Sequence, residues 1–199
     1  ERWRGLLELR AELGDESIGF EPSGGYELIH ADAPLYARVA ERLEDLDRSL
    51  RGVFRKPVFR WADERLPSLG LRAGHLAWNP LEGAVDSGML IRTLLRKAQG
   101  EGVEVRFNSR VDGWEEEKDG LSFRLGDGST LKAAQAVFAT NGYTRGLIPD
   151  SDVVPGRGQV VLTSAIPDLA LKGTFHMDEG FYYFRDLGDK VLLGGGRNL

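Results

Sequence analysis

Apolar residues recur at helical spacing in three parts of the chain. In residues 34–51 they fall every three or four positions, at Leu35, Val39, Leu43, Leu46 and Leu50. This spacing predicts an amphipathic helix. Residues 2–13 repeat the pattern and predict a second helix. A third is expected at about 88–99, because Asp86 just before it is a residue type that caps helix N-termini.

Elsewhere the pattern is typical of strands. Residues 103–107 alternate between apolar and polar, and three stretches joined by tight turns predict a meander at 110–117, 121–125 and 130–132. Ala136–Ala139 is wholly apolar, as a strand buried on both faces would be. Further strands are expected at 18–21 and 26–30, paired as a hairpin, and at 58–61, 74–78, 159–163, 180–185 and 190–193.

The order of these elements divides the chain into three segments. Residues 1–85 hold helices and short strands, 86–150 alternate helix and strand, and 151–199 are again rich in strands. We expect the first and third segments to share one antiparallel sheet. The predicted fold class is therefore α+β or α/β, with an α/β segment beside a mixed, largely antiparallel sheet that carries helices.

Composition narrows the class of protein. The chain has 199 residues, of which 41% are hydrophobic and 29% charged, and a net charge of −5, all ordinary for a soluble globular protein with a core. Acidic and basic residues are mixed without a basic stripe, which argues against a nucleic-acid partner. No apolar run approaches the ~18 residues of a membrane span, and the charged start is unlike a signal peptide. We expect a cytoplasmic location.

Residue usage also limits the chemistry. The chain has no cysteine, which excludes disulfides and thiolate nucleophiles. Its three histidines, His30, His75 and His176, lie far apart, so no metal site is predicted. The chain starts without methionine and ends by running from an apolar stretch into three glycines. We therefore expect a piece of a longer protein.

The sharpest candidate site follows Ala136–Ala139, which ends abruptly in Thr140, Asn141 and Gly142. Ligands of open α/β sheets dock at the carboxyl ends of strands, where small side chains let a flat ligand approach the backbone. The alternative is a plain turn, since Asn-Gly is a common turn pair.

A family resemblance favours the first interpretation. The run from Gly102 through the meander to Val137-Phe-Ala-Thr-Asn-Gly-Tyr-Thr resembles the middle of the D-amino-acid oxidase, glycine oxidase and sarcosine oxidase superfamily of flavoenzymes. Pro155-Gly-Arg-Gly-Gln, Gly180-Phe-Tyr-Tyr-Phe-Arg and Gly188-Asp-Lys-Val-Leu-Leu-Gly-Gly are similar to its later strands. The resemblance covers roughly 83–199. It implies that 86–150 is part of an FAD-binding domain, and that 1–85 and 151–199 belong to a substrate domain.

The resemblance also implies site residues. Val111 and Ala139, Thr140, Asn141 and Gly142 would contact FAD, although Val111 could equally be a plain core residue. Candidates for the substrate wall are Tyr182, Tyr183, Arg185 and Gln159. Strand alternation puts Tyr182 on one face and Tyr183 with Arg185 on the other, and of the two tyrosines we favour Tyr182. Lone His176 could lie near the pocket. No catalytic side chain is predicted.

The sequence departs from the family in lacking G-x-G-x-x-G, the loop that seats the FAD pyrophosphate. We expect this chain alone to bind FAD weakly or not at all, and to be inactive. The implied activity of the full-length parent is oxidation of a C–N bond in a small amine or amino acid, with hydride transfer to flavin. The alternative is a ligand-binding or protein-interaction module without redox chemistry.

Overall fold

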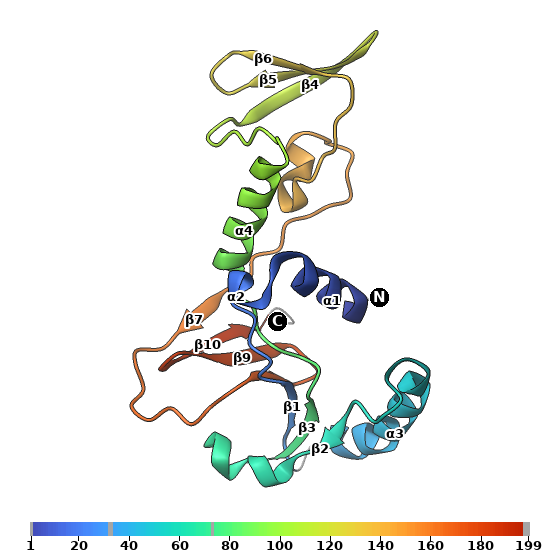
Figure 1. The fold of residues 1–199 in the computed structure, drawn as a ribbon, viewed down its shortest axis with the longest axis vertical. Coiled ribbons are helices and arrows are strands. Elements are labelled where there is room, and N and C mark those ends of the chain that lie inside the picture. The colour runs from blue at the N-terminus through green and yellow to red at the C-terminus, as the bar shows by residue number, and fades with distance from the viewer. Residues whose placement is uncertain (1, 32–33, 73, 197–199) are drawn as a thin grey trace. The chain divides into compact units, whose positions relative to one another are not determined.

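The computed structural model describes residues 2–31, 34–72 and 74–196, which form two compact units. The first unit comprises Glu1–Lys97 and Gly158–Leu199, and the second comprises Ala98–Arg157. The second unit is thus inserted in the chain between the two parts of the first. Figure 1 shows the elements along the chain. No helix within the described ranges is long and apolar enough to cross a bilayer.

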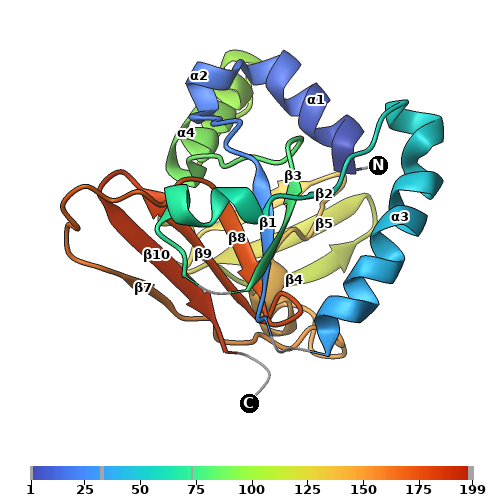
Figure 2. The same cartoon turned by 90° about the horizontal axis from the view of Figure 1, so that it is seen from below.

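A seven-stranded sheet forms the centre of the first unit (Figure 2). Its strands, in spatial order, are β2 (Arg60–Trp61), β3 (His75–Asn79), β1 (Gly25–Ile29), β8 (Thr174–Met177), β9 (Tyr182–Leu187), β10 (Lys190–Gly195) and β7 (Val160–Leu162). Neighbouring strands are antiparallel except β1 and β8, which are parallel. The prediction that the first and last segments share one sheet is confirmed. The sheet is mixed and not wholly antiparallel, because β1 and β8 are parallel.

Among the described residues, four α-helices belong wholly or mainly to the first unit: α1 (Arg2–Leu13), α2 (Asp15–Ile18), α3 (Leu35–Phe54) and α4 (Ser87–Gly100). The predictions for α1, α3 and α4 are confirmed. Asp86 caps α4 as expected, because its Oδ1 accepts a hydrogen bond of 2.8 Å from the Met89 N–H. Helix α3 runs past the predicted end at residue 51 to Phe54, and the positive φ of 56° at the C-cap residue Arg55 closes its last turn. The side chain of Leu35 lies outside the described part of the chain.

The apolar core lies on one face of the sheet. Tyr26, Phe175 and Phe184 stack across β1, β8 and β9, with ring centroids 4.8 Å apart in each neighbouring pair. The short 3-10 helices η1 (Asp63–Arg65) and η2 (Pro67–Leu69) and the segment around Leu171 cover this stack. Side chains alternate across a strand, so the residues next to these three aromatics point to the opposite face.

The second unit is built on the predicted meander, with β4 (Val111–Glu117), β5 (Gly120–Leu125) and β6 (Thr130–Ala133). Its small core gathers Phe138 against Trp114 and Phe123, at centroid distances of 5.1 and 6.2 Å. The indole N–H of Trp114 donates a 2.8 Å hydrogen bond to the Leu147 carbonyl and so ties the sheet to the segment after η3 (Asn141–Gly146).

Three strand predictions are wrong. Residues 18–21 do not form a hairpin with 26–30, because Ile18 ends α2 with its side chain fully buried, and β1 pairs instead with β3 and β8. Residues 103–107 and 136–139 are irregular, and Val137 is 92% exposed. A strand needs neighbours for its backbone hydrogen bonds, and the described residues supply none to these two stretches. Strand β8, in contrast, was not expected.

Candidate functional site

The sheet face opposite the core carries a row of polar side chains. Strand register aligns five residues across β3, β1, β8, β9 and β10: Ala77, Glu27, His176, Tyr183 and Gly194. His176 and Tyr183 are directly opposed in an antiparallel pair, in which Cβ atoms lie about 4.5–5.5 Å apart, and Glu27 is the register partner of His176 in the parallel pair. A carboxylate, an imidazole and a phenol therefore lie side by side, with a small residue at each end. This set can hold a ligand by hydrogen bonds and by charge.

Glu27 has an unusual environment within this row. Burial raises the pKa of its carboxyl group, His176 acts in the opposite direction, and Glu82 and Glu179 raise the pKa further. The Glu82 carboxylate lies over Gly25, where a Cβ would overlap it, and it accepts a 2.8 Å hydrogen bond from the Asn79 amide. Glu27, Glu82 and His176 surround a small cavity of about 70 Å³. A cation or a hydrogen-bond donor would be favoured there.

The two predicted tyrosines lie on opposite faces, as alternation requires. Tyr182 shares its face with Phe184, the core side. Tyr183 lies on the polar face, where its ring covers Gly194 so closely that a Cβ at that position would overlap it. The geometry therefore favours Tyr183 over Tyr182 as the residue beside Glu27 and His176. The role of either tyrosine in substrate binding stays a prediction.

Arg185 and Gln159 lie away from the row. The Arg185 guanidinium reaches the Val85 carbonyl at 3.5 Å, just before α4, and lines a cavity of about 290 Å³ whose other charged residues include Lys172 and Asp186. Gln159 is exposed and lies just before β7. The structure thus brings Tyr183 next to His176, whereas Arg185 lies two residues further along β9 and its guanidinium reaches the segment before α4.

The residues expected to contact a cofactor lie in the second unit. Val111 begins β4 and is half-buried, whereas Ala139 and Asn141 are exposed. Thr140 precedes η3 and its hydroxyl lies 3.0 Å from that of Thr144. A Cβ at Gly142 would lie 3.2 Å from the Pro155 Cβ, so the chain passes close to itself there.

These residues fit one side of a flat cofactor. The side chains from 139 to 142 are small and, within the second unit, no bulky group covers Ala139 or Asn141. They provide no phosphate-binding loop at a helix N-terminus. The exposure of Ala139 and Asn141 is compatible with a flat ligand at this place, and the contact of Ala139, Thr140, Asn141 and Gly142 with a cofactor stays a prediction.

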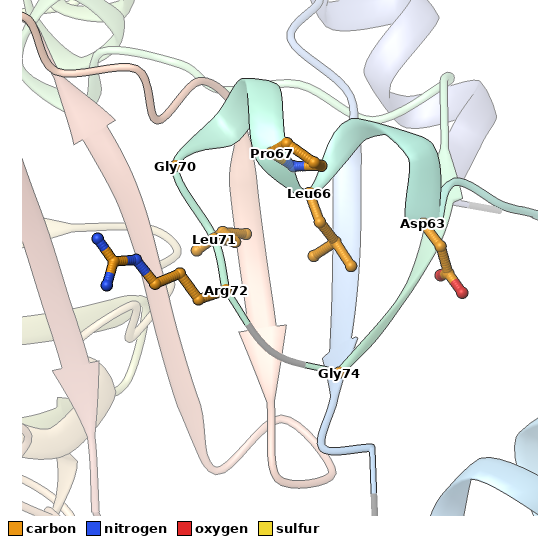
Figure 3. A pocket seen from close by; sticks show the side chains of 7 residues that line it. All are labelled: Asp63, Leu66, Pro67, Gly70, Leu71, Arg72 and Gly74. Carbon is orange, nitrogen blue, oxygen red and sulfur yellow. The ribbon is translucent and has the colours of Figure 1, made fainter.

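A larger cavity of about 680 Å³ lies on the core side, formed by the loop that carries η1 and η2 (Figure 3). Its charged residues, Asp63 and Arg72, lie at opposite ends of the view. The Asp63 carboxylate is already engaged, because it accepts a 2.8 Å hydrogen bond from the Leu76 N–H and lies 2.7 Å from Nδ1 of His75. No converging polar groups mark this cavity as the site.

The sequence did not single out Glu27 or Glu82. The signal for Glu27 was present, since a charged residue stands between apolar neighbours in Gly25-Tyr-Glu-Leu-Ile. Its position opposite His176 required knowledge that β1 pairs with β8.

Comparison with known proteins identifies the family of this chain. Residues 1–199 match the DAO family, described as FAD dependent oxidoreductase. Curated protein sequences give no match. Among solved structures, the chain is similar to L-proline dehydrogenase from P. horikoshii, with a TM-score of 0.73, 18% identity, and coverage of 97% of this chain and 54% of that one.

Two further solved structures show the same likeness. Glycine oxidase from Geobacillus kaustophilus has a TM-score of 0.73 and 23% identity, with coverage of 96% of this chain and 53% of that one. Iminodiacetate oxidase from Chelativorans sp. BNC1 has a TM-score of 0.73 and 21% identity, with coverage of 98% and 53%. The chain spans about half the length of these structures, and at such identities the likeness establishes the fold. Since the family match extends over the whole sequence, the chain belongs to the DAO family of FAD-dependent oxidoreductases.

Proposed function

We propose that the full-length protein oxidises a C–N bond of a small-molecule amine or amino acid. The observation that carries this proposal is the Glu27–His176–Tyr183 row, which lies on the sheet face away from the core. Family membership supports the redox part of the proposal. The similar structures include an L-proline dehydrogenase and a glycine oxidase, which supports a C–N bond as the reacting group.

The chain's own residues would bind and orient the substrate. The Tyr183 hydroxyl would donate a hydrogen bond to a substrate carboxylate, and Glu27 and His176 would lie beside the rest of the molecule. Val111, Ala139, Thr140, Asn141 and Gly142 would line FAD. Bound FAD supplies the acceptor for the hydride that leaves the carbon next to nitrogen, and water then hydrolyses the resulting imine. No nucleophilic side chain is required. We place this reaction in the cytoplasm.

The test is a substrate screen on the full-length protein under anaerobic conditions. We expect the purified protein to show the flavin absorption bands, and an amine or amino acid to bleach them with formation of ammonia or a shorter amine. A colourless protein, or a flavin that no amine or amino acid bleaches, would contradict the proposal. The first outcome would favour a module without redox chemistry.

A variant pair then tests the site. Tyr183→Phe should weaken substrate binding, because it removes a hydroxyl on the polar face. Tyr182→Phe is the matched control, since the same atom is removed from the neighbouring residue on the core face. Equal effects of the two substitutions on the concentration of substrate that half-bleaches the flavin would argue against this face as the substrate wall.

A further inference from the structure

Basic residues gather in one stretch of a chain that is acidic overall. From Arg48 to Trp61 there are five basic residues and no acidic one, whereas the whole chain carries a net charge of −5. Two of the five have partners, because Arg48 forms a 2.7 Å ion pair with Asp45 and the Arg60 guanidinium lies 4.2 Å from the centre of the Trp78 ring. The other three are exposed and meet no carboxylate of the described residues: Arg51, Arg55 and Lys56.

The N-terminal end of α1 adds two positive charges at the same place. The rings of Trp3 and Phe54 meet edge to face with centroids 5.6 Å apart, so the start of α1 lies beside the last turn of α3 (Figure 2). Arg2 and Arg4 flank Trp3, are exposed, and have no carboxylate partner in the part of the chain that the structure describes. We name the five unpaired residues the basic end: Arg2, Arg4, Arg51, Arg55 and Lys56.

Helix stability accounts for only part of this charge. A cation near a helix C-terminus is favoured by the helix dipole, and Arg51 stands in the last turn of α3. At a helix N-terminus a cation is disfavoured, and the first turn of α1 holds no acidic residue that would offset Arg2 and Arg4. Such departures from local preference are expected where a function requires them. The basic end therefore favours an anionic partner.

Apolar side chains within the basic end favour a lipid surface as that partner. Val53 stands between Arg51 and Arg55 in the sequence and is 67% exposed. Trp3, between the two arginines of α1, is half-buried. Cations that surround exposed apolar and aromatic groups are typical of helices that lie on anionic membranes, because the cations meet the headgroups while the apolar groups enter the boundary with the acyl chains.

We propose that the basic end binds the surface of an anionic phospholipid membrane as a reversible, peripheral contact. The rest of the chain is net negative and is repelled by such a surface, so the attraction of the basic end also orients the molecule. This contact goes beyond the proposed function and does not depend on it.

The experiment is co-sedimentation of the full-length protein with vesicles. One set of vesicles is phosphatidylcholine alone, and the other contains about 30% phosphatidylserine as the anionic lipid. We expect binding to the anionic vesicles, no detectable binding to the neutral ones, and a steep loss of binding between about 0.05 and about 0.5 M salt, because salt screens exposed charges.

Variants test the two helices separately. Each basic residue near an anionic surface is worth about fivefold in affinity. The combined change Arg51→Gln, Arg55→Gln and Lys56→Gln should therefore weaken vesicle binding about 100-fold, and Arg2→Gln with Arg4→Gln about 25-fold. Val53→Ser leaves the charge unchanged and should weaken binding about three- to tenfold, because it removes apolar surface from the lipid boundary.

A triple variant elsewhere is the matched control for charge. It replaces three exposed basic residues that lie outside the basic end and have no carboxylate partner among the described residues: Arg72→Gln, Arg92→Gln and Lys118→Gln. The control should weaken binding less than about threefold, since those side chains lie away from the surface. Urea unfolding of each variant verifies that it is folded.

The outcomes separate this proposal from its alternatives. Absence of binding to anionic vesicles overturns it, as would follow if another segment of the full-length protein covered the basic end. Equal binding to both kinds of vesicle, or an equal loss in the two triple variants, overturns it too. Release from vesicles by an excess of inorganic phosphate at constant ionic strength would assign the basic end to a free anion. Vesicle binding without flavin bleaching by any amine would support the membrane contact while refuting the proposed function.

Discussion

The buried carboxylate of Asp47 should hold α3 in place. Its Oδ1 accepts hydrogen bonds from two consecutive backbone N–H groups, that of Val58 at 2.8 Å and that of Phe59 at 3.0 Å. Asp47 is 8% exposed and Val58 is 4% exposed. This single atom therefore joins the helix to the segment that carries Phe59, a residue that lines two cavities beside α3.

The structure sets the size of the effect. Asp47→Ala leaves two N–H groups without their acceptor, and each buried donor left unpaired costs about 1–3 kcal/mol. The Phe59 N–H is only partly buried, so the loss of its acceptor should cost free energy at the lower end of that range. The sum is roughly 2–4 kcal/mol, a large part of the 5–15 kcal/mol that typically separates folded from unfolded domains. Asp47→Asn keeps a carbonyl acceptor and should lose only about 1 kcal/mol.

Urea unfolding followed by tryptophan fluorescence measures these differences, with the free energy of unfolding extrapolated to water. Asp45→Ala is the control on the same helix, because Asp45 is exposed and contacts Arg48 alone among the hydrogen bonds described. It should change stability by less than about 0.5 kcal/mol. If Asp47→Ala cost no more than Asp45→Ala, the two hydrogen bonds would not hold α3, and the argument from buried N–H groups would fail.

Three further predictions concern the row and the second unit. Tyr183→Phe should weaken substrate binding by at least about tenfold, the loss expected for a hydrogen bond to a charged group, with Tyr182→Phe near wild type in the same flavin-bleaching titration. Burial raises the pKa of Glu27, so the folded chain holds this proton more tightly than the unfolded chain does. The stabilisation from the protonated form is complete below the ordinary carboxyl pKa of about 4.3 and is lost as pH rises through the raised pKa. Glu27→Gln should flatten that decline in urea unfolding measured from pH 4 upward, and an unchanged decline would show that Glu27 is not its cause. Trp114→Phe keeps the packing on Phe138 but loses the bond to the Leu147 carbonyl, so the second unit should unfold about 1 kcal/mol more easily, with no change if water replaces the indole N–H.

The sequence predicted elements that depend on local pattern. Helix α3 and the β4–β5–β6 meander followed from residue spacing and turn residues, which act over a few positions. The prediction of a strand at Ala136–Ala139 was wrong. An apolar run indicates burial, but a strand also requires a neighbouring strand for its backbone hydrogen bonds. Strand β8 does alternate between polar and apolar residues, as Thr174-Phe-His-Met, but it is only four residues long, too short for the pattern to distinguish it.

The site was predictable only in part, for the same reason. Alternation correctly separated Tyr182 from Tyr183, but it could not say which face meets the core. That choice depends on Phe184 stacking on Phe175 of a strand that was not foreseen. Glu27 was overlooked because a charged residue in a strand usually faces solvent, and only the pairing of β1 with β8 brings it beside His176.

The parallel seam between β1 and β8 has a consequence for biosynthesis. The hydroxyl of Thr174 donates to the Gly24 carbonyl across a separation of 150 residues. At ribosomal rates of 5–20 residues per second, roughly 8–30 s pass between the synthesis of these two partners. During that interval the edge of β1 that later pairs with β8 has no partner strand. The sixty-residue insert Ala98–Arg157 can meanwhile fold its own three-stranded meander. A nascent chain of this kind exposes a bare strand edge of the type that chaperones shield.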